Sequence, residues 1–187
     1  VIVVGQSAVG KTSIILRLTE DIFNDDLVVT TSAAYVNYTF EYEENRSKKQ
    51  STVSIWDTAG QERYQALTQV YYRNTNIAFV CIDLTNPQSL RFLDTCIPII
   101  LQKSLNTEIQ IVVLANKSDC ELIKLTDKEI NEKCIEYNVK WYKVSAKTGD
   151  NLKKSVDEVL CQYMTKKPDN EEYALKKIQQ KEKSGCC

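Results

Sequence analysis

The sequence predicts an α/β fold in which helices cover both faces of a mostly parallel six-stranded sheet with one antiparallel edge strand. Two patterns support this prediction. The apolar runs 77–84 and 109–115 lack polar alternation and are separated by a helical segment, which is typical of parallel strands buried on both faces. Alternating residues at 34–42 and 52–56 flank a polar stretch at 43–50, which indicates a hairpin and a polar turn.

The first strand leads into a phosphate-binding motif. An apolar run at 1–4 precedes the sequence G-x-x-x-x-G-K-T, and a helical pattern follows it. Its glycines allow backbone N–H groups and a helix N-terminus to point at one anion. Lys11 would reach the outer phosphates, and Thr12 would place its hydroxyl on Mg²⁺. We therefore expect a P-loop NTPase whose nucleotide contacts here are Gly5, Ser7, Ala8, Val9, Gly10, Lys11, Thr12 and Ser13.

Composition excludes several classes of catalytic and metal-binding site. A length of 187 residues suits one domain, and the net charge of -1 gives no signal for nucleic-acid binding. The chain has no histidine, which excludes Ser-His-Asp catalysis and histidine-ligated metals. The internal cysteines lack C-x-x-C spacing, so we expect reduced thiols.

A second phosphate motif, D-x-x-G, begins at the end of the strand predicted at 52–56. Asp57 can hold a magnesium ion through water, and the Gly60 N–H can approach a γ-phosphate because no Cβ intervenes. A helix is expected over 65–74. In series with the phosphate-binding loop, this motif predicts a Mg²⁺-nucleoside triphosphate site.

A third motif, N-K-x-D, follows the strand at 109–115. The Asp119 carboxylate can accept hydrogen bonds from guanine N1–H and N2–H₂, a donor pair that adenine lacks. Two charge-assisted bonds predict a preference of roughly hundreds-fold or more for guanine. After the last strand, at 141–144, the Ala146 N–H can meet guanine O6. The expected nucleotide-binding residues of this half are Asn116, Lys117, Asp119, Ser145, Ala146 and Lys147.

Three helices have readable signals. Pro87 opens one, and Pro98 is expected to kink it or end it early. A capping box at 126–129 begins the second, and apolar positions over 152–163 place the third against the core.

Residues 165–187 are expected to form a flexible tail after a domain at 1–164, because the tail is lysine-rich with few apolar residues. The tail ends in Cys186 and Cys187. Two terminal thiols are suitable attachment points for two isoprenoid chains, which together give firm membrane anchoring.

With these residues in order, the chain resembles the Ras superfamily over essentially its whole length, and within it the Rab family. The resemblance rests on W-D-T-A-G-Q-E-R-Y at 56–64, Y-Y-R at 71–73, D-L-T-N at 83–86 with Ser89, and the Cys-Cys end. The segment 5–11 together with Ala33 and Ala34 is similar to the endosomal Rab subgroup. The resemblance implies a GTP-hydrolysing switch in vesicle trafficking on the cytoplasmic face of an endosomal membrane, cycling with the cytosol.

The same resemblance implies residue roles and partners. Thr30 would coordinate Mg²⁺ and sense the γ-phosphate, and Gln61 would orient the attacking water. The expected catalytic residues are thus Gln61, Lys11 and Thr30, and the metal ligands are Thr12, Thr30 and Asp57. Expected partners are GTP and GDP, a GTPase-activating protein, an exchange factor, a GDP-dissociation inhibitor or escort protein, and effectors. We expect a monomer that binds membrane through prenyl groups and binds no nucleic acid.

The chain departs from the family at two places. It reads T-T-S at 30–32 where the family usually reads T-I-G, and its 43–50 turn is longer than expected. Two alternatives stay open. A P-loop kinase for a small molecule explains Lys11 and Thr12 but not Asp119, and a non-hydrolysing GTP-bound scaffold is suggested by the unusual 30–32 segment.

Overall fold

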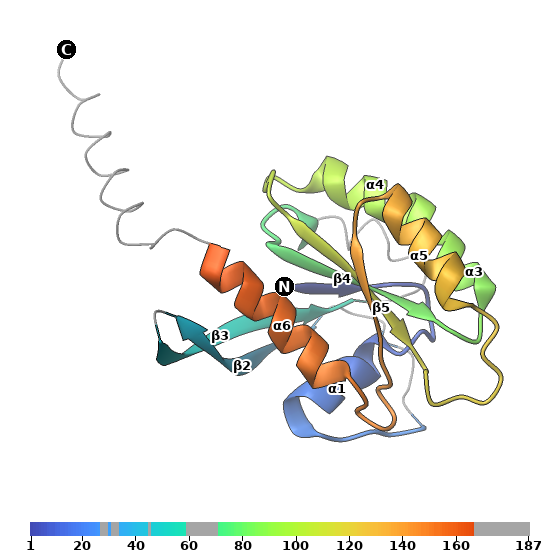
Figure 1. Ribbon diagram of the computed structural model, residues 1–187, viewed down its shortest axis with the longest axis horizontal. Helices are drawn as coiled ribbons and strands as arrows, with labels where there is room; N and C mark the ends of the chain where they lie inside the picture. Colours follow the sequence, from blue (N-terminus) through green and yellow to red (C-terminus); the bar gives the residue numbers. More distant parts are fainter. Residues whose placement is uncertain (27–29, 31–33, 45, 59–70, 167–187) are drawn as a thin grey trace, which may run out of the picture.

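The structure is a computed structural model that describes residues 1–26, 30, 34–44, 46–58 and 71–166 (Figure 1). Its sheet has six strands in the order β2-β3-β1-β4-β5-β6. Only the edge strand β2 runs antiparallel to its neighbour, so the predicted fold class is confirmed. The strands are β1 (Ile2–Val4), β2 (Ala34–Glu44), β3 (Ser47–Asp57), β4 (Ile77–Asp83), β5 (Gln110–Asn116) and β6 (Lys140–Lys143). The helices are α1 (Lys11–Glu20), α3 (Pro87–Arg91), α4 (Leu93–Lys103), α5 (Asp127–Glu136) and α6 (Leu152–Lys166).

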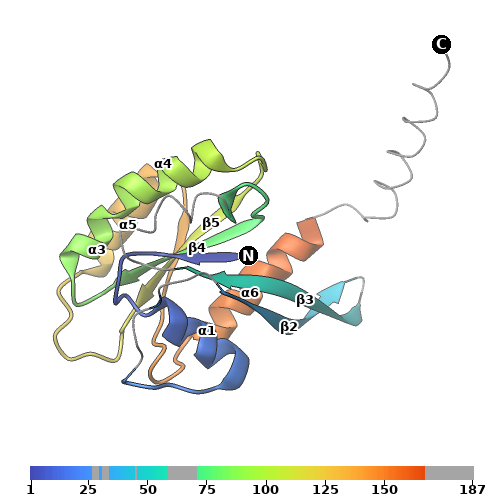
Figure 2. The ribbon, with the colours of Figure 1, turned by 180° about the vertical axis from the view of Figure 1, so that it is seen from behind.

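Helices cover the sheet on both faces, as Figures 1 and 2 show from opposite sides. Helices α1 and α6 pack on one face, where Ile14 and Val156 are fully buried. Helices α3, α4 and α5 pack on the other, where Ile97 and Ile130 are fully buried. Strands between two apolar layers must be apolar throughout, which explains the unbroken burial of β4.

The hairpin corrects one prediction. The expected turn at 43–50 is largely strand, because β2 continues to Glu44 and β3 begins at Ser47. Cross-strand charge pairing explains the difference. Glu43 lies opposite Lys48, and Lys49 forms an ion pair with Glu44. Opposite charges on neighbouring strands stabilise the ladder, so a charged run that indicates a turn by composition extends the sheet instead.

Pro98 does not end its helix, so the predicted early end there is wrong. The interruption lies at Phe92, between α3 and α4, and α4 continues through Pro98 to Lys103. Proline removes the hydrogen bond to the carbonyl four residues earlier, which belongs to Asp94. Both residues are solvent-exposed, so water can satisfy that carbonyl.

Helix α5 begins with the capping box that the sequence predicts. The capping box is confirmed: Thr126 Oγ1 accepts a hydrogen bond from the Glu129 N–H, and the Glu129 side chain accepts one from the Thr126 N–H. Most of the helix expected at 65–74 and nearly all of the 165–187 tail lie outside the described residues. Within the described part, no helix has the length and apolar character needed to cross a membrane.

Candidate functional site

A cavity of about 400 Å³ opens at the carboxyl ends of the parallel strands. The loops that follow β1, β5 and β6 form its walls, which is where open α/β sheets bind ligands. It brings together many of the residues predicted from separate motifs, along with several that were not predicted. Among the described residues its lining is Ser7, Ala8, Gly10, Lys11, Thr12, Ser13, Phe23, Asn24, Asp25, Thr30, Asn116, Lys117, Asp119, Cys120, Ala146 and Lys147.

Two glycines allow the phosphate-binding loop to lie close to the sheet. Gly10 has φ +94°, and a Cβ there would lie 2.4 Å from Asn116 Nδ2. A Cβ on Gly5, at φ +153°, would lie 2.5 Å from the Cys81 carbonyl oxygen. Any other residue at these positions would push the loop away from its neighbours, so both glycines are required by the loop's shape. Val9, predicted as a contact, is buried beneath the loop.

Lys11 lies at the base of the cavity and is only 6% exposed. Its Nζ donates to the Gly5 carbonyl at 3.1 Å and to the Gln6 carbonyl at 2.9 Å. Burial lowers the pKa of Lys11, and the negative charge of Asp57 acts in the opposite direction. The ammonium group is therefore held by two neutral acceptors, and a phosphate would be a stronger, charged acceptor.

The three predicted metal ligands lie together. Thr12 Oγ1 donates to Asp57 Oδ2 at 2.8 Å and lies 2.8 Å from Thr30 Oγ1. Among the described residues, Asp57 Oδ1 is the one buried side-chain polar atom without a hydrogen-bond partner. Burial raises the pKa of Asp57, and the Thr12 hydrogen bond acts against that rise. Two hydroxyls and an unsatisfied carboxylate oxygen are the hard oxygen donors that Mg²⁺ prefers, so these residues fit the ion.

Asn116 connects the loops on the two sides of the cavity. Its Nδ2 donates to the Val9 carbonyl at 2.9 Å, and its Oδ1 accepts from the Ala146 N–H at 2.9 Å. The side chain is 2% exposed. The Ala146 N–H predicted to meet guanine O6 is thus already directed at Asn116, and a guanine oxygen would share or replace this contact.

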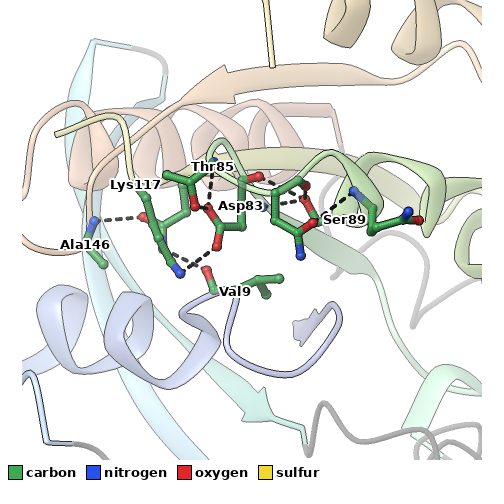
Figure 3. Close-up of polar contacts among 9 residues, drawn as sticks. Val9, Asp83, Thr85, Ser89, Lys117 and Ala146 are labelled. Carbon is green, nitrogen blue, oxygen red and sulfur yellow. Dashed lines mark hydrogen bonds and ion pairs between the residues drawn. The ribbon is translucent and has the colours of Figure 1, made fainter. Parts of the chain in front are cut away.

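Lys117 is held by a buried carboxylate at the end of β4. Its Nζ lies 2.6 Å from Asp83 Oδ2, and the other Asp83 oxygen accepts from the N–H and hydroxyl of Thr85 at 2.8 Å (Figure 3). Ser89 Oγ accepts from the Asp83 N–H at 2.9 Å. The D-L-T-N segment and Ser89, noted in the sequence only for their resemblance, therefore fix the orientation of Lys117.

Asp119 and Ser145 are in contact. Ser145 Oγ donates to Asp119 Oδ1 at 2.5 Å and accepts from the Thr148 N–H at 3.0 Å. Because this bond occupies one carboxylate oxygen of Asp119 and fixes the side chain, the protein itself sets the orientation of the predicted guanine acceptor.

Phe23 and Asp25 line the cavity but were not predicted from the sequence, and both lie near Lys147, which was predicted. Lys147 Nζ lies 5.9 Å from the ring centre of Phe23 and 4.0 Å from Asp25 Oδ1. Arg17 lies just outside the lining and donates to the Ala146 and Lys147 carbonyls. These contacts join positions more than a hundred residues apart, so no local motif indicates them. The one available signal for Arg17 is its place in the last turn of a helix, where a cation is favoured.

Four predicted site residues cannot be placed. Gly60, Gln61, Cys186 and Cys187 lie outside the described residues, as do Thr31 and Ser32.

Comparisons with known proteins show the family of this chain. The model of the Ras family matches residues 1–165. The chain is 38% identical over 153 residues to GTP-binding protein ypt5 of Schizosaccharomyces pombe, covering 81% of this chain and 71% of ypt5. It is 33% identical to Ras-related protein Rab-32D of Dictyostelium discoideum, covering 92% of this chain and 77% of that protein. It is also 33% identical to Ras-related protein Rab-21 of Bos taurus, covering 88% and 72%.

The chain belongs to the Ras family. Its similarity to several Rab proteins makes it a Rab-type small GTPase, so the resemblance inferred from the motifs is confirmed. It is accordingly an enzyme that hydrolyses GTP and a molecular switch in membrane trafficking. Members of this family use GTP and GDP with Mg²⁺ and act through regulators and effectors.

Proposed function

We propose that this Rab-type GTPase binds GTP and GDP in the cavity described above and acts as a switch on endosomal membranes. The observation that carries the site assignment is that Thr12, Thr30 and Asp57 meet beside Lys11, with Asp57 Oδ1 unpartnered within the part of the chain that the structure describes. A buried carboxylate oxygen without a partner costs free energy unless an ion or ligand satisfies it. A Mg²⁺-bound nucleotide satisfies it and gives Lys11 a charged acceptor.

Thr12, Thr30 and Asp57 would hold the metal ion. Once bound, Mg²⁺ neutralises charge on the outer phosphates. Lys11 and the N–H groups of the phosphate-binding loop bind those phosphates, and Gln61 orients the attacking water, since a neutral amide is too weak to act as a base. No arginine occurs between residues 22 and 30, where an internal arginine could enter the site. Unaided hydrolysis is therefore slow, on the order of 10⁻⁴ s⁻¹, until an activating protein supplies one.

Guanine is bound by the opposite wall. Asp119 accepts from the base, while Asn116, Ser145 and Ala146 keep the two surrounding loops in place. Lys117 and Lys147 carry aliphatic chains that can cover the faces of the base. This arrangement supports guanine over adenine and disfavours the small-molecule kinase.

Effectors recognise an aromatic surface next to the γ-phosphate-sensing segments. Trp56 lies between Tyr35 and Tyr71, with ring centres 5.2 Å and 4.8 Å apart respectively. Tyr35 is 59% exposed. The T-T-S segment and the D-x-x-G segment are adjacent to these rings in sequence. If the conformation of either segment depends on the bound nucleotide, this aromatic surface changes with it. An exposed tyrosine packed on half-buried aromatic rings favours a protein partner.

The proposal also includes membrane association through the C-terminal tail and an endosomal location. We assign residues 1–164 to the GTPase domain and 165–187 to a flexible tail that carries prenyl groups on Cys186 and Cys187. The endosomal location is proposed from the resemblance of residues 5–11 together with Ala33 and Ala34. An escort protein or dissociation inhibitor would carry the prenylated chain through the cytosol.

The decisive experiment is to identify the nucleotide that co-purifies with the protein and to measure its release with and without Mg²⁺. We expect GDP or GTP, with release slowed by Mg²⁺. Bound ATP, or no affinity for guanine nucleotides in a folded sample, would overturn the site assignment.

Hydrolysis is tested with Gln61→Leu. This variant should retain GTP in single-turnover assays with an activating protein, whereas the wild type releases phosphate. Equal phosphate release by both proteins would refute the role of Gln61, and no release by the wild type even with its activator would favour the non-hydrolysing scaffold.

A further inference from the structure

We propose that Arg17 is a positioning residue for guanine binding, acting through the loop at 145–149. This inference rests on the nucleotide site proposed above. Arg17 lies in the last turn of α1 and does not line the cavity. It contacts the backbone of the loop that carries Ala146, whose N–H is expected to meet guanine O6.

The contacts of Arg17 use several donors of its guanidinium group. Nε donates to the Ala146 carbonyl at 3.0 Å, and Nη2 donates to the Lys147 carbonyl at 2.7 Å. Nη1 donates to the backbone and side-chain oxygens of Asp21 at 2.8 Å and 2.9 Å. The side chain is only 17% exposed. A planar group with donors at fixed angles holds two successive carbonyls in one orientation, which a lysine cannot do.

The loop also passes next to the aliphatic part of this side chain, at an ordinary van der Waals distance. Gly149 has φ +81°, and a Cβ there would lie 3.5 Å from Arg17 Cδ. The Ala146 peptide groups are thus held from two sides, since Asn116 accepts from the N–H and Arg17 donates to the carbonyl. Because each peptide unit is planar, fixing the Ala146 and Lys147 carbonyls also fixes the N–H groups of Lys147 and Thr148, and with them the backbone that follows the Ala146 N–H.

Arg17 also connects the two halves of the site. Helix α1 begins at Lys11 and Thr12, the phosphate and metal residues, and Arg17 follows about 9 Å further along the same rigid helix. Through Arg17, the base-binding loop is therefore held at a fixed position relative to the phosphate-binding loop. Loss of Arg17 leaves two loop carbonyls without their charged donor, and the loop can then rotate away from the base.

The experiment measures release of a fluorescent GDP from full-length wild type, Arg17→Lys, Arg17→Ala and the control Asp21→Asn, all with Mg²⁺. Arg17→Ala should release GDP at least about tenfold faster, because two charge-assisted hydrogen bonds are lost. Arg17→Lys should fall between Arg17→Ala and the wild type, since one ammonium group can reach one carbonyl. Asp21→Asn, which changes only the exposed end of the network, should differ by less than about twofold.

A second nucleotide separates positioning from a general loss of structure. The diphosphate of 2-aminopurine riboside keeps the 2-amino group and lacks the 6-oxo group that Ala146 would bind. It also lacks the N1–H that would donate to Asp119, but this loss is the same for the wild type and the variant. Arg17→Ala should therefore speed its release much less than that of GDP. The effect on GDP release should also exceed the effect on single-turnover hydrolysis of saturating GTP.

Equal acceleration for both nucleotides, or unchanged GDP release in Arg17→Ala, would overturn the positioning role. If Arg17→Ala does not fold, the comparison of Arg17→Lys with the wild type decides the question by the same criteria. Failure of the wild type itself to bind GDP would instead overturn the proposed function.

Discussion

The two sides of the cavity differ in how completely their polar groups are paired. On the base side, Asn116, Lys117, Asp119 and Ser145 each hold a hydrogen-bond partner from another loop or strand. On the metal side, Asp57 is buried, and its Oδ1 has no partner among the described residues. Asp119 is exposed, so water can satisfy its second oxygen, whereas the buried Asp57 Oδ1 needs an ion or a ligand.

This difference suits a switch. A base site that is already ordered can hold GTP and GDP equally, because both carry the same guanine. The metal side must respond to the γ-phosphate, which only GTP has, and a response requires groups whose contacts differ between the two states. Full pairing at that end would stabilise one state regardless of the nucleotide.

The largest effect is expected from breaking the residue that joins the two sides. Asn116→Ala leaves the Val9 carbonyl and the Ala146 N–H without partners and removes the contact between their loops. Each buried group left unpaired costs about 1–3 kcal/mol, so the loss of two partners should make GDP release at least about thirtyfold faster. Stopped-flow measurement of fluorescent GDP release gives this rate directly.

Asn106→Ala is the matched control for that variant. Asn106 also contacts backbone on both sides, through Nδ2 to the Thr75 carbonyl and Oδ1 from the Glu108 N–H, but it does not line the nucleotide cavity. Its substitution should lower thermal stability while GDP release changes by less than about twofold. Comparable acceleration in both variants would show that the joining role of Asn116 is wrong.

A smaller effect is expected from neutralising the metal side. Asp57→Asn keeps a hydrogen-bond acceptor for Thr12 but removes the negative charge. Mg²⁺ should slow GDP release in the wild type, and this variant should lose roughly tenfold of that slowing because a charged ligand becomes neutral. The internal control is chelation, since both proteins should release GDP at similar rates in EDTA. A variant that keeps the full Mg²⁺ response would show that Asp57 does not serve the ion.

Much of the fold and of the expected site is readable because the informative residues are close in sequence. The P-loop, the D-x-x-G and the N-K-x-D motifs each span a few residues after an apolar strand, and parallel strands bring their carboxyl ends to one edge. Local pattern and topology together therefore locate the cavity.

The misses share a physical cause, which is a partner that lies far away in sequence or on another strand. Composition at 43–50 indicates a turn, but the opposing strand supplies the matching charges. Arg17 contacts carbonyls 129 and 130 residues away, and backbone acceptors leave no trace in the sequence. Phe23 and Asp25 reach the cavity only through the path of a loop without regular structure.

The smallest effect is expected outside the cavity, where Tyr38 of β2 forms hydrogen bonds with two residues of α6. The Tyr38 hydroxyl donates to Asp157 Oδ1 at 2.6 Å and accepts from Lys153 Nζ at 2.8 Å. Burial and the Asp157 hydrogen bond raise the pKa of Tyr38 from 10.0 to about 12. Between these values the unfolded chain releases this proton and the folded chain keeps it, so the stability that Tyr38 contributes falls as pH rises through the window.

Tyr38→Phe should lower the free energy of unfolding by about 1–2 kcal/mol below pH 10, measured by urea unfolding. The difference in this free energy between the variant and the wild type should narrow above pH 10. Tyr35→Phe, on the exposed end of the same strand, is the control, and a gap that stays constant or widens with pH would refute the assignment.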